Sequence, residues 1–396
     1  MAFVNAAIRD QDGTHGEARV GNAECERARR PGNCRGNGRF GQEEPLVEHN
    51  DLSFGPADDC YHRLSDDPFE TETNWWSWNV PERKIGGWIH APYYPNRNTL
   101  TWRIFVWDER GYDPARMAYY KKVENAPMPE AADLRSITFP SGGYSLRMIE
   151  PGMKYHLQYD DAERGFALDF IHTGVHPPRR FDPGEPPFLQ TPHYDQLGHI
   201  VGTMRLDGES IAIDCWSVRD RTWGPRGGPY AQSRKQNYAN AFDRVKHPGG
   251  ARWREIERER GRGRIQYIFG HAGGTSGFLG FVRPQDGDCD GWSPMNGGYL
   301  LRDGRFEALN KTACRMRGFR NPQTGWCSHM AVELRDTAGR TMTAEGIAVS
   351  RMSEAGYGTN QLMRWEFDGR IGWGEDQDVW NAEHFVRMLD ALRAWR

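Results

Sequence analysis

Short runs in which apolar and polar residues alternate make up most of the chain. In "TLTWRIFVW" (residues 99–107), every second residue from Leu100 to Val106 is apolar and falls on one side of an extended strand. Similar runs, such as "NWWSWNV" and "KIGGWIHAPYY", are separated by turn-forming segments such as "PNRN" and "DDAERG". The pattern predicts antiparallel strands with one apolar face, as in the wall of a sandwich or barrel.

The second half of the chain repeats one turn signal. "RLDGES", "LRDGRF" and "EFDGRI" each place Asp-Gly between strand-like runs, which is the strongest short-range signal for a hairpin, and "RDTAGRT" is a looser version. Strands are therefore expected at residues 199–206, 210–218, 264–270, 277–283, 298–302, 313–319, 329–335, 341–349 and 362–367. The final segment, "DVWNAEHFVRMLDALRAW", predicts a helix with Asp378 as its N-cap, and "AQSRKQNYANAFDRV" predicts a weaker one.

Length and local composition predict two domains. A chain of 396 residues exceeds what one apolar core usually organises. Residues 1–45 are rich in Arg, Gly and Asn and are expected to form a disordered tail. The proline-rich segment 176–192 is the expected linker. It separates an N-terminal β domain, residues 46–190, from a C-terminal β domain with a terminal helix, residues 191–396, so the predicted class is all-β.

Composition and charge exclude several classes of partner. The chain has 15 Trp, 15 Tyr, 18 Phe and 46 Gly, which favours strands and tight turns. A net charge of −3 gives no field that would attract nucleic acid, and no apolar run reaches the length of a transmembrane helix. Seven cysteines without a C-x-x-C pair, and no export signal, predict reduced thiols in the cytoplasm. A homodimer is compatible with these features.

Metal and nucleotide sites are weakly indicated. His172 and His176 lie four residues apart, and His193 and His199 six apart, but neither pair has the spacing and extra ligands of zinc or iron sites. The glycine-rich "GHAGGTSG" leads into a strand-like run instead of a helix that could hold phosphate. We therefore expect no metal and no cofactor.

The stretch "IDCWSVRDRTWGPR" carries the most distinctive chemistry. If it is extended, Asp220 shares a face with Trp216 and Val218, while Arg219 and Arg221 point to the other side. Two interpretations stay open. In one, the arginines form salt bridges that clamp a barrel rim and Trp223 simply packs. In the other, a carboxyl group and aromatic faces surround an apolar pocket.

The segment "HYDQLGHIVGTMRLDGESIAIDCWSVRDRTWGPR" resembles the lipocalin-like AttH and carotenoid 1,2-hydratase (hydroxyneurosporene synthase) superfamily, and most closely its two-domain bacterial members. Their pattern is an aromatic and acidic entry, a hairpin flanked by glycines, and "R-D-[HR]-[ST]-W-G-x-R". It is matched here by His193, Tyr194, Asp195, Gln196, Gly202, Gly208, Arg219, Asp220, Arg221, Thr222, Trp223, Gly224 and Arg226. Arg221 and Thr222 replace a common His-Ser pair, so the role of that histidine does not carry over.

The resemblance implies two lipocalin-like β domains and an apolar cavity for a hydrophobic, unsaturated small molecule of isoprenoid, steroid or polyketide type. It also implies addition of water, isomerisation or cyclisation at a C=C bond without a cofactor. Such chemistry needs a protonated acid and aromatic faces beside a developing cation.

Roles at the site follow as hypotheses. Asp220 is the candidate acid, Asp195 is the second candidate, and His193 and Tyr194 would orient water or relay protons. The expected ligand-binding set is Trp216, Trp223, Arg219, Arg221 and Arg226. Glu375 and Asp376 are further acidic candidates, although a solvated loop is the simpler interpretation of "WGEDQD". A non-catalytic lipid or terpenoid carrier and a pericyclase remain alternatives.

Overall fold

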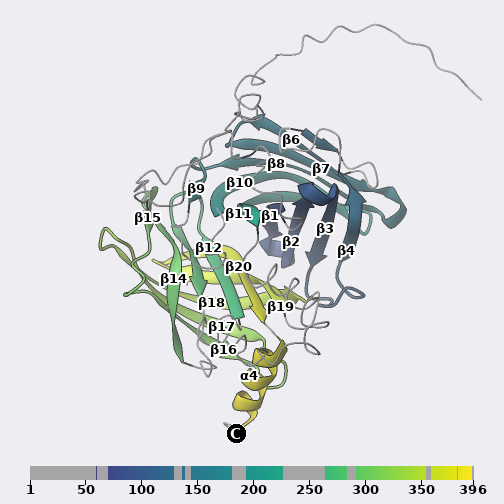
Figure 1. Ribbon diagram of the computed structural model, residues 1–396. Helices are drawn as coiled ribbons and strands as arrows, with labels where there is room; N and C mark the ends of the chain where they lie inside the picture. Colours follow the sequence, from purple (N-terminus) through teal and green to yellow (C-terminus); the bar gives the residue numbers. More distant parts are fainter. Residues whose placement is uncertain are drawn as a thin grey trace, which may run out of the picture. The chain divides into compact units, whose positions relative to one another are not determined.

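The chain folds into two antiparallel β-sheets followed by an α-helix (Figure 1). The computed structural model describes residue 59 and residues 70–128, 136–138, 144–180, 193–225, 264–282, 291–353, 358–380 and 382–394. The predicted all-β class is confirmed. The predicted tail (1–45) and the weaker predicted helix (231–245) lie outside these residues, as does most of the predicted linker. No helix in the described part of the chain is long and apolar enough to cross a membrane.

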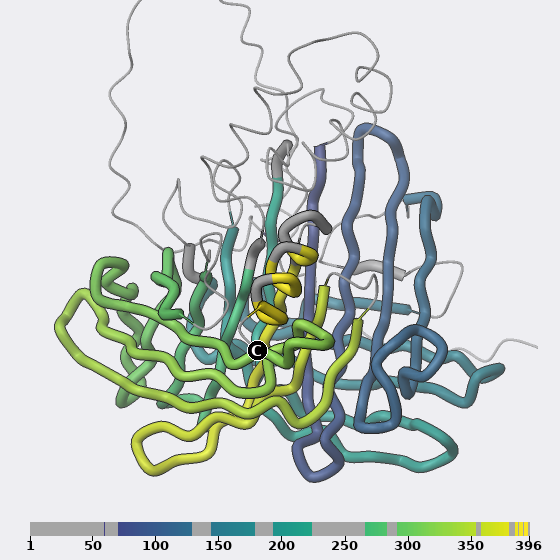
Figure 2. Tube along the Cα trace, turned by 90° about the horizontal axis from the view of Figure 1, so that it is seen from below, coloured from purple at the N-terminus to yellow at the C-terminus, as the bar shows by residue number. Residues whose placement is uncertain are grey.

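The first sheet is built from residues 70–225, and its strand order is β4-β3-β2-β1-β11-β10-β8-β7-β6-β5, with β9 paired to β10. Its strands are β1 (Glu70–Val80), β2 (Ile85–Tyr94), β3 (Thr99–Trp107), β4 (Tyr119–Pro127), β5 (Ser136–Thr138), β6 (Ser145–Glu150), β7 (Lys154–Asp161), β8 (Phe166–Gly174), β9 (Arg179–Arg180), β10 (His193–Leu206) and β11 (Glu209–Pro225). The β10–β11 hairpin joins the two halves of the sheet, because β11 pairs with β1 and β10 pairs with β8. Figure 2 shows the teal β11 beside the purple β1.

The second sheet closes on itself. Its strands are β12 (Arg264–His271), β13 (Gly277–Val282), β14 (Trp292–Arg302), β15 (Arg305–Ala308), β16 (Arg315–Arg320), β17 (Cys327–Arg335), β18 (Thr341–Met352), β19 (Gly358–Phe367) and β20 (Arg370–Trp380). The order is β13-β12-β20-β19-β18-β17-β16-β14-β15, and an extra pairing of β13 with β14 closes the barrel. Helix α4 (Ala382–Ala394) follows β20.

The three Asp-Gly turns form as predicted. Asp207, Asp303 and Asp368 have φ of 54°, 53° and 50°, and the glycine after each also has a positive φ. Positive φ at both central residues is the type I′ geometry whose twist matches that of antiparallel strands. This local chemistry therefore fixes the hairpins β10–β11, β14–β15 and β19–β20.

Alternation along the strands separates three apolar layers. On β1, Trp76 and Trp78 enter the core of the first sheet, while Trp75 points the other way. A second core fills the barrel and includes Ile268 and Trp365. The third, which we call the inter-sheet layer, draws on both sheets and includes Trp75, Trp88, Phe105, Leu197, Val218, Tyr267, Phe269, Leu279, Phe281 and Tyr299.

Two predicted boundaries differ from the structure. The expected domain boundary near residue 190 does not separate the sheets, because β10 and β11 belong to the first sheet and the change of sheet falls between β11 and β12; the division into domains itself stays a prediction. Asp378 is not a helix N-cap. It lies in β20, buried, with Oδ2 2.6 Å from Arg320 Nη1. The apolar pattern misled because Val379 fits a strand face as well as a helix stripe.

Candidate functional site

The β10–β11 hairpin brings two predicted acids together. Asp195 and Asp220 are direct cross-strand partners, and His193 stands opposite Thr222 on the same face. Asp195 and His193 are buried, whereas Asp220 is half-buried. The period of two along each strand puts all four side chains on the face that looks toward the barrel. Three of the four predicted catalytic residues therefore meet at one place.

Hydrogen bonds fix the imidazole and one of the carboxyl groups. His193 Nε2 lies 3.0 Å from Asp195 Oδ2, and His193 Nδ1 lies 2.7 Å from Thr222 Oγ1. From the barrel, the Tyr267 hydroxyl donates to Asp195 Oδ1 at 2.7 Å. Both ring nitrogens and both Asp195 oxygens are thus engaged, so His193 and Asp195 are held in one orientation and Asp220 is the more accessible acid.

Aromatic rings surround this group. Trp75 is the cross-strand partner of Asp220, and its ring meets that of Tyr267 edge-on at 6.2 Å. Phe281 lies 4.9 Å from Tyr267 and 5.9 Å from the His193 ring. Burial, together with the charges of Asp195 and Asp220, raises the pKa of Tyr267 well above its ordinary value. The phenol therefore stays neutral and can only donate to Asp195.

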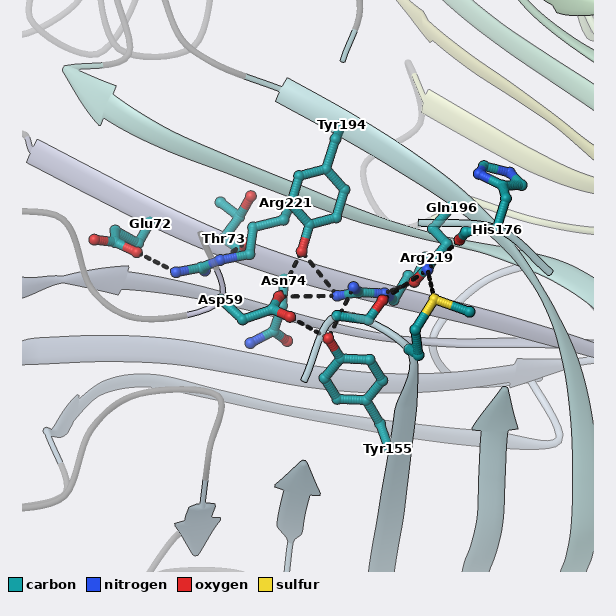
Figure 3. A network of polar contacts seen from close by, with 12 residues as sticks. Asp59, Glu72, Thr73, Asn74, Tyr155, His176, Tyr194, Gln196, Arg219 and Arg221 are labelled. Atoms are coloured by element: carbon teal, nitrogen blue, oxygen red, sulfur yellow. Dashed lines mark hydrogen bonds and ion pairs between the residues drawn. The ribbon is translucent and has the colours of Figure 1, made fainter. Parts of the chain in front are cut away.

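The two arginines beside Asp220 serve the opposite face of the sheet (Figure 3). Arg219 is fully buried and donates to Asp59 at 3.1 Å, to the Tyr194 hydroxyl at 2.9 Å and to the Tyr155 hydroxyl at 2.9 Å. Arg221 is fully buried as well and pairs with Glu72. The predicted separation of Asp220 from its arginine neighbours is what the geometry shows.

Asp59 is held as a carboxylate in this network. Burial by itself would raise the pKa of Asp59, but Arg219, Arg221 and the hydroxyls of Tyr155 and Tyr194 outweigh it and lower the pKa below its ordinary value. Removing one member of a buried ion pair leaves the other charged and desolvated, which is strongly destabilising. The arrangement is that of a structural clamp between the N-terminal part of the chain and β11.

The other predicted residues lie away from the His193–Asp195–Asp220 group. Tyr194 is on the Asp59 side, where its hydroxyl donates to Asp59 Oδ1 at 2.5 Å, and Trp223 packs against it with ring centroids 6.2 Å apart. Trp216 stacks on His199 at 4.5 Å, four residues along β11 from Asp220. Arg226 lies outside the described residues.

Glu375 and Asp376 are not in a solvated loop, so that interpretation is wrong. Both are buried in β20, with Asp376 facing the barrel interior and Glu375 facing the inter-sheet layer. Glu375 receives a hydrogen bond from Gln377 Nε2 at 3.3 Å and another from the Ser77 hydroxyl. Burial raises the pKa of Glu375 to about 8, which these hydrogen bonds only partly offset.

Sequence reasoning did not single out Trp75, Tyr267 or Asp59. The signal for Trp75 was the alternation in "NWWSWNV", but nothing local shows which strand its face meets. The sequence spacing paired His193 with His199, whereas in the structure His193 lies beside Asp195 and Asp220. His193, Asp195 and Asp220 each place one ligand atom within 4.8 Å of the others, and within the described residues these are the side chains that could hold a metal ion.

Two surface hollows lie elsewhere. One of about 740 Å³ is on the outside of the barrel and is lined by charged side chains that include Glu345, Arg364 and Arg370. The other, of about 240 Å³, lies near Tyr112 and Trp326. Neither includes the His193 group. The segments next to that group in sequence, residues 181–192 and 226–263, lie outside the described part of the chain.

The chain matches one family profile and is similar to several solved structures. The profile of a family described as "Domain of unknown function (DUF7064)" matches residues 55–381. Among solved structures, a putative AttH from Nitrosomonas europaea is similar with a TM-score of 0.50 and 14% identity, covering 85% of this chain and 99% of that one. Kievitone hydratase from Nectria haematococca gives 0.43 and 9%, covering 83% and 96%. CghA with Sch210972 gives 0.45 and 10%, covering 79% and 89%. A search among curated proteins returned no match.

Proposed function

This chain belongs to the DUF7064 family, and we propose that it binds a hydrophobic, unsaturated small molecule in the inter-sheet layer and catalyses cofactor-free proton transfer at a C=C bond. Addition of water, isomerisation and cyclisation all begin with such a transfer. Asp220 is the carboxyl group that exchanges a proton with the ligand, and His193 and Asp195 are fixed beside it.

The observation that carries this proposal is the meeting of Asp195, Asp220 and His193 beside a layer that is otherwise apolar and rich in aromatic rings. A group that transfers protons to carbon must be desolvated yet reachable, and Asp220 is half-buried where its neighbours are buried. Hydrogen bonds from Thr222 and Tyr267 hold the rest of the group in place, so little reorganisation accompanies the reaction.

The aromatic rings of the layer suit a cationic transition state. Protonation of an alkene leaves positive charge on carbon, and the faces of Trp75, Tyr267 and Phe281 carry negative quadrupole density. Each desolvated face contributes about 0.5–2 kcal/mol to a cation within reach. Arg219 and Arg221 do not oppose this charge, because their guanidinium groups bind Asp59 and Glu72 on the other side of the sheet.

Three measurements test the proposal. Native mass spectrometry of the gently purified protein identifies any co-purified ligand, and thermal shift with retinol, farnesol and progesterone measures binding. Each probe is then incubated with the protein in heavy water, and mass spectrometry detects deuterium on its carbon atoms. The expected result is binding together with deuterium incorporation that Asp220→Asn lowers by roughly 100-fold or more.

Asp214→Asn is the matched control, because Asp214 lies on the same strand with a side chain that is 75% exposed. It should leave incorporation unchanged. Binding without incorporation would indicate a carrier. Incorporation that survives Asp220→Asn would mean that another group transfers the proton. Conversion of a probe without incorporation, in wild type and in Asp220→Asn alike, would indicate a pericyclase-type pocket in which no single carboxyl group is indispensable. Each of these results would refute the assigned role of Asp220.

A further inference from the structure

A second acid, Glu375, borders the same layer. Glu375 is the cross-strand partner of Phe269, and Trp75 is the cross-strand partner of Asp220. The rings of Trp75 and Phe269 meet at 6.4 Å. Glu375 and Asp220 therefore lie on the two sides of one aromatic pair, one on the barrel and the other on the first sheet.

The hydrogen bond between Ser77 and Glu375 shows which part of β1 lies beside the Glu375 carboxyl group. Ser77 follows Trp75 by two residues on β1, which corresponds to about 7 Å along a strand. Glu375 and Asp220 therefore reach the layer at different positions along β1. They suit the two ends of an extended conjugated system.

The neighbours of Glu375 are neutral. Besides Ser77, its carboxyl group is contacted by the amides of Gln377 and Asn360, and the Ser77 hydroxyl continues to the Ser217 hydroxyl on β11. Within the described residues, no Lys or Arg forms a salt bridge with Glu375, so no positive charge compensates for the water that the buried carboxyl group has lost. A buried carboxyl group in such a setting favours its protonated form.

The orientation of Asn360 points the same way. Its amide is satisfied when the oxygen accepts from Trp88 Nε1 at 2.8 Å and the nitrogen donates to Thr359 O at 3.2 Å. The amide atom 3.4 Å from Glu375 Oε2 is then the oxygen. In that orientation Asn360 donates no hydrogen bond to the Glu375 carboxyl group, which removes one interaction that would favour the charged form.

We propose that Glu375 is the proton donor of this site and that Asp220 removes a proton at the far end of a conjugated ligand, so that the net reaction is a double-bond shift. This assignment rests on the proposed function and deepens it by naming the substrate class, an extended conjugated polyene. It follows the rule that two acids in contrasting environments take opposite roles in proton transfer.

The step balances without a co-reactant. The Glu375 proton forms a C–H bond at one end of the conjugated system with electrons from its π bonds. The C–H bond at the other end breaks, its proton goes to an Asp220 oxygen, and its electrons complete the shifted double bond. The ligand keeps its formula, and the two carboxyl groups regain their starting states by exchange with water.

Ionisation of Glu375 gives the step a pH signature. Among the described residues, the Cys215 thiol of β11 interacts with Glu375; burial raises its pKa to about 12, so it stays neutral in the relevant range. The pKa of Glu375 itself is about 8. The rate of the wild-type protein should therefore be constant near neutrality and fall as the pH rises through about 8.

The test uses retinol as the conjugated probe. Wild type, Glu375→Gln, Asp220→Asn and the control Glu345→Gln are incubated with retinol in heavy water, and deuterium incorporation is followed against pH. Glu375→Gln should lose roughly 100-fold or more of the rate while retinol binding, measured by fluorescence, is retained. The Glu345 side chain is 75% exposed, so its variant should keep the wild-type rate.

Infrared spectroscopy gives a readout that needs no turnover. The carbonyl band of a protonated carboxylic acid should be present in wild type at neutral pH, absent above the Glu375 pKa, and missing in Glu375→Gln. A wild-type spectrum without that band would overturn the inference.

The remaining outcomes separate the inference from the proposed function. If Asp220→Asn abolishes incorporation and Glu375→Gln does not, the proposed function stands and the inference fails. If wild type binds retinol and the other probes and incorporates no deuterium, both fail. Uptake of heavy oxygen from labelled water would mean hydration, which overturns the double-bond shift alone.

Discussion

Replacing Glu375 with glutamine should remove a pH dependence from the stability of this protein. The ordinary pKa of a glutamate, 4.5, applies to the unfolded chain, and burial raises the pKa of Glu375 to about 8 in the folded one. Between these values the folded protein holds a proton that the unfolded chain has released. The free energy of unfolding must therefore fall as the pH rises across this window, and stay level on either side of it.

The size of the effect follows from the two values. Each pH unit inside the window costs about 1.36 kcal/mol, so the whole interval from 4.5 to about 8 amounts to roughly 5 kcal/mol. That is a large share of the 5–15 kcal/mol that is typical of folded proteins. Glutamine has the shape of a glutamic acid and cannot ionise, so Glu375→Gln should match wild type in acid and exceed it in alkali.

Urea unfolding at a series of pH values measures this directly. Because other groups also titrate, the informative quantity is the difference in unfolding free energy between the variant and wild type. It should grow by about 1.36 kcal/mol for each pH unit inside the window and then level off. Glu345→Gln, at a side chain that is 75% exposed, is the control and should show no such growth. A constant difference for Glu375→Gln would refute the assignment of a buried protonated acid.

Three further variants, one of them with a matched control variant, test other contacts by urea unfolding. Asp59→Asn should cost about 3–5 kcal/mol, because it leaves a buried arginine without its carboxylate; a loss below about 1 kcal/mol would contradict the clamp. Gly374→Ala should lower the free energy of unfolding by about 1–3 kcal/mol or more, because the added Cβ would lie 2.0 Å from a carbonyl oxygen of β12. The control Gly358→Ala, whose added Cβ has its nearest neighbour at 3.9 Å, should stay within about 0.5 kcal/mol of wild type. Equal effects of the two variants would disprove the crowding argument. Tyr267→Phe should cost about 1–3 kcal/mol by leaving an Asp195 oxygen unsatisfied, and unchanged stability would show that this bond is not formed.

Local sequence chemistry predicted the parts of the fold that local chemistry determines. The Asp-Gly turns form because Asp and Gly accept the positive φ that a two-residue hairpin needs. The two sides of β11 were predictable for a similar reason, because period-two alternation separates Asp220 from Arg219 and Arg221 wherever the strand is placed. Neither inference required knowledge of a distant residue.

The partners of those side chains were not predictable in this way. Arg219 meets Asp59 from 160 positions away, and Tyr267 reaches Asp195 across 72 positions. The alternation of apolar and polar residues along a strand indicates which face is buried, but it does not indicate which strand of another sheet covers that face. The burial of Glu375 was missed for this reason, since "WGEDQD" is polar enough for a loop and becomes a strand only through its pairing with β12 and β19.

The alternation along β11 also limits how this strand can change in length. Deleting one residue just before Arg219 would exchange the two faces of everything that follows. Asp220 would then point at Asp59, and the two arginines would enter the aromatic layer. Substitutions can adjust either face separately, whereas an insertion or deletion at the Asp207-Gly208 tip leaves the order of the two faces along β11 unchanged. A designer who wishes to alter the pocket must therefore work residue by residue and keep the strand length constant.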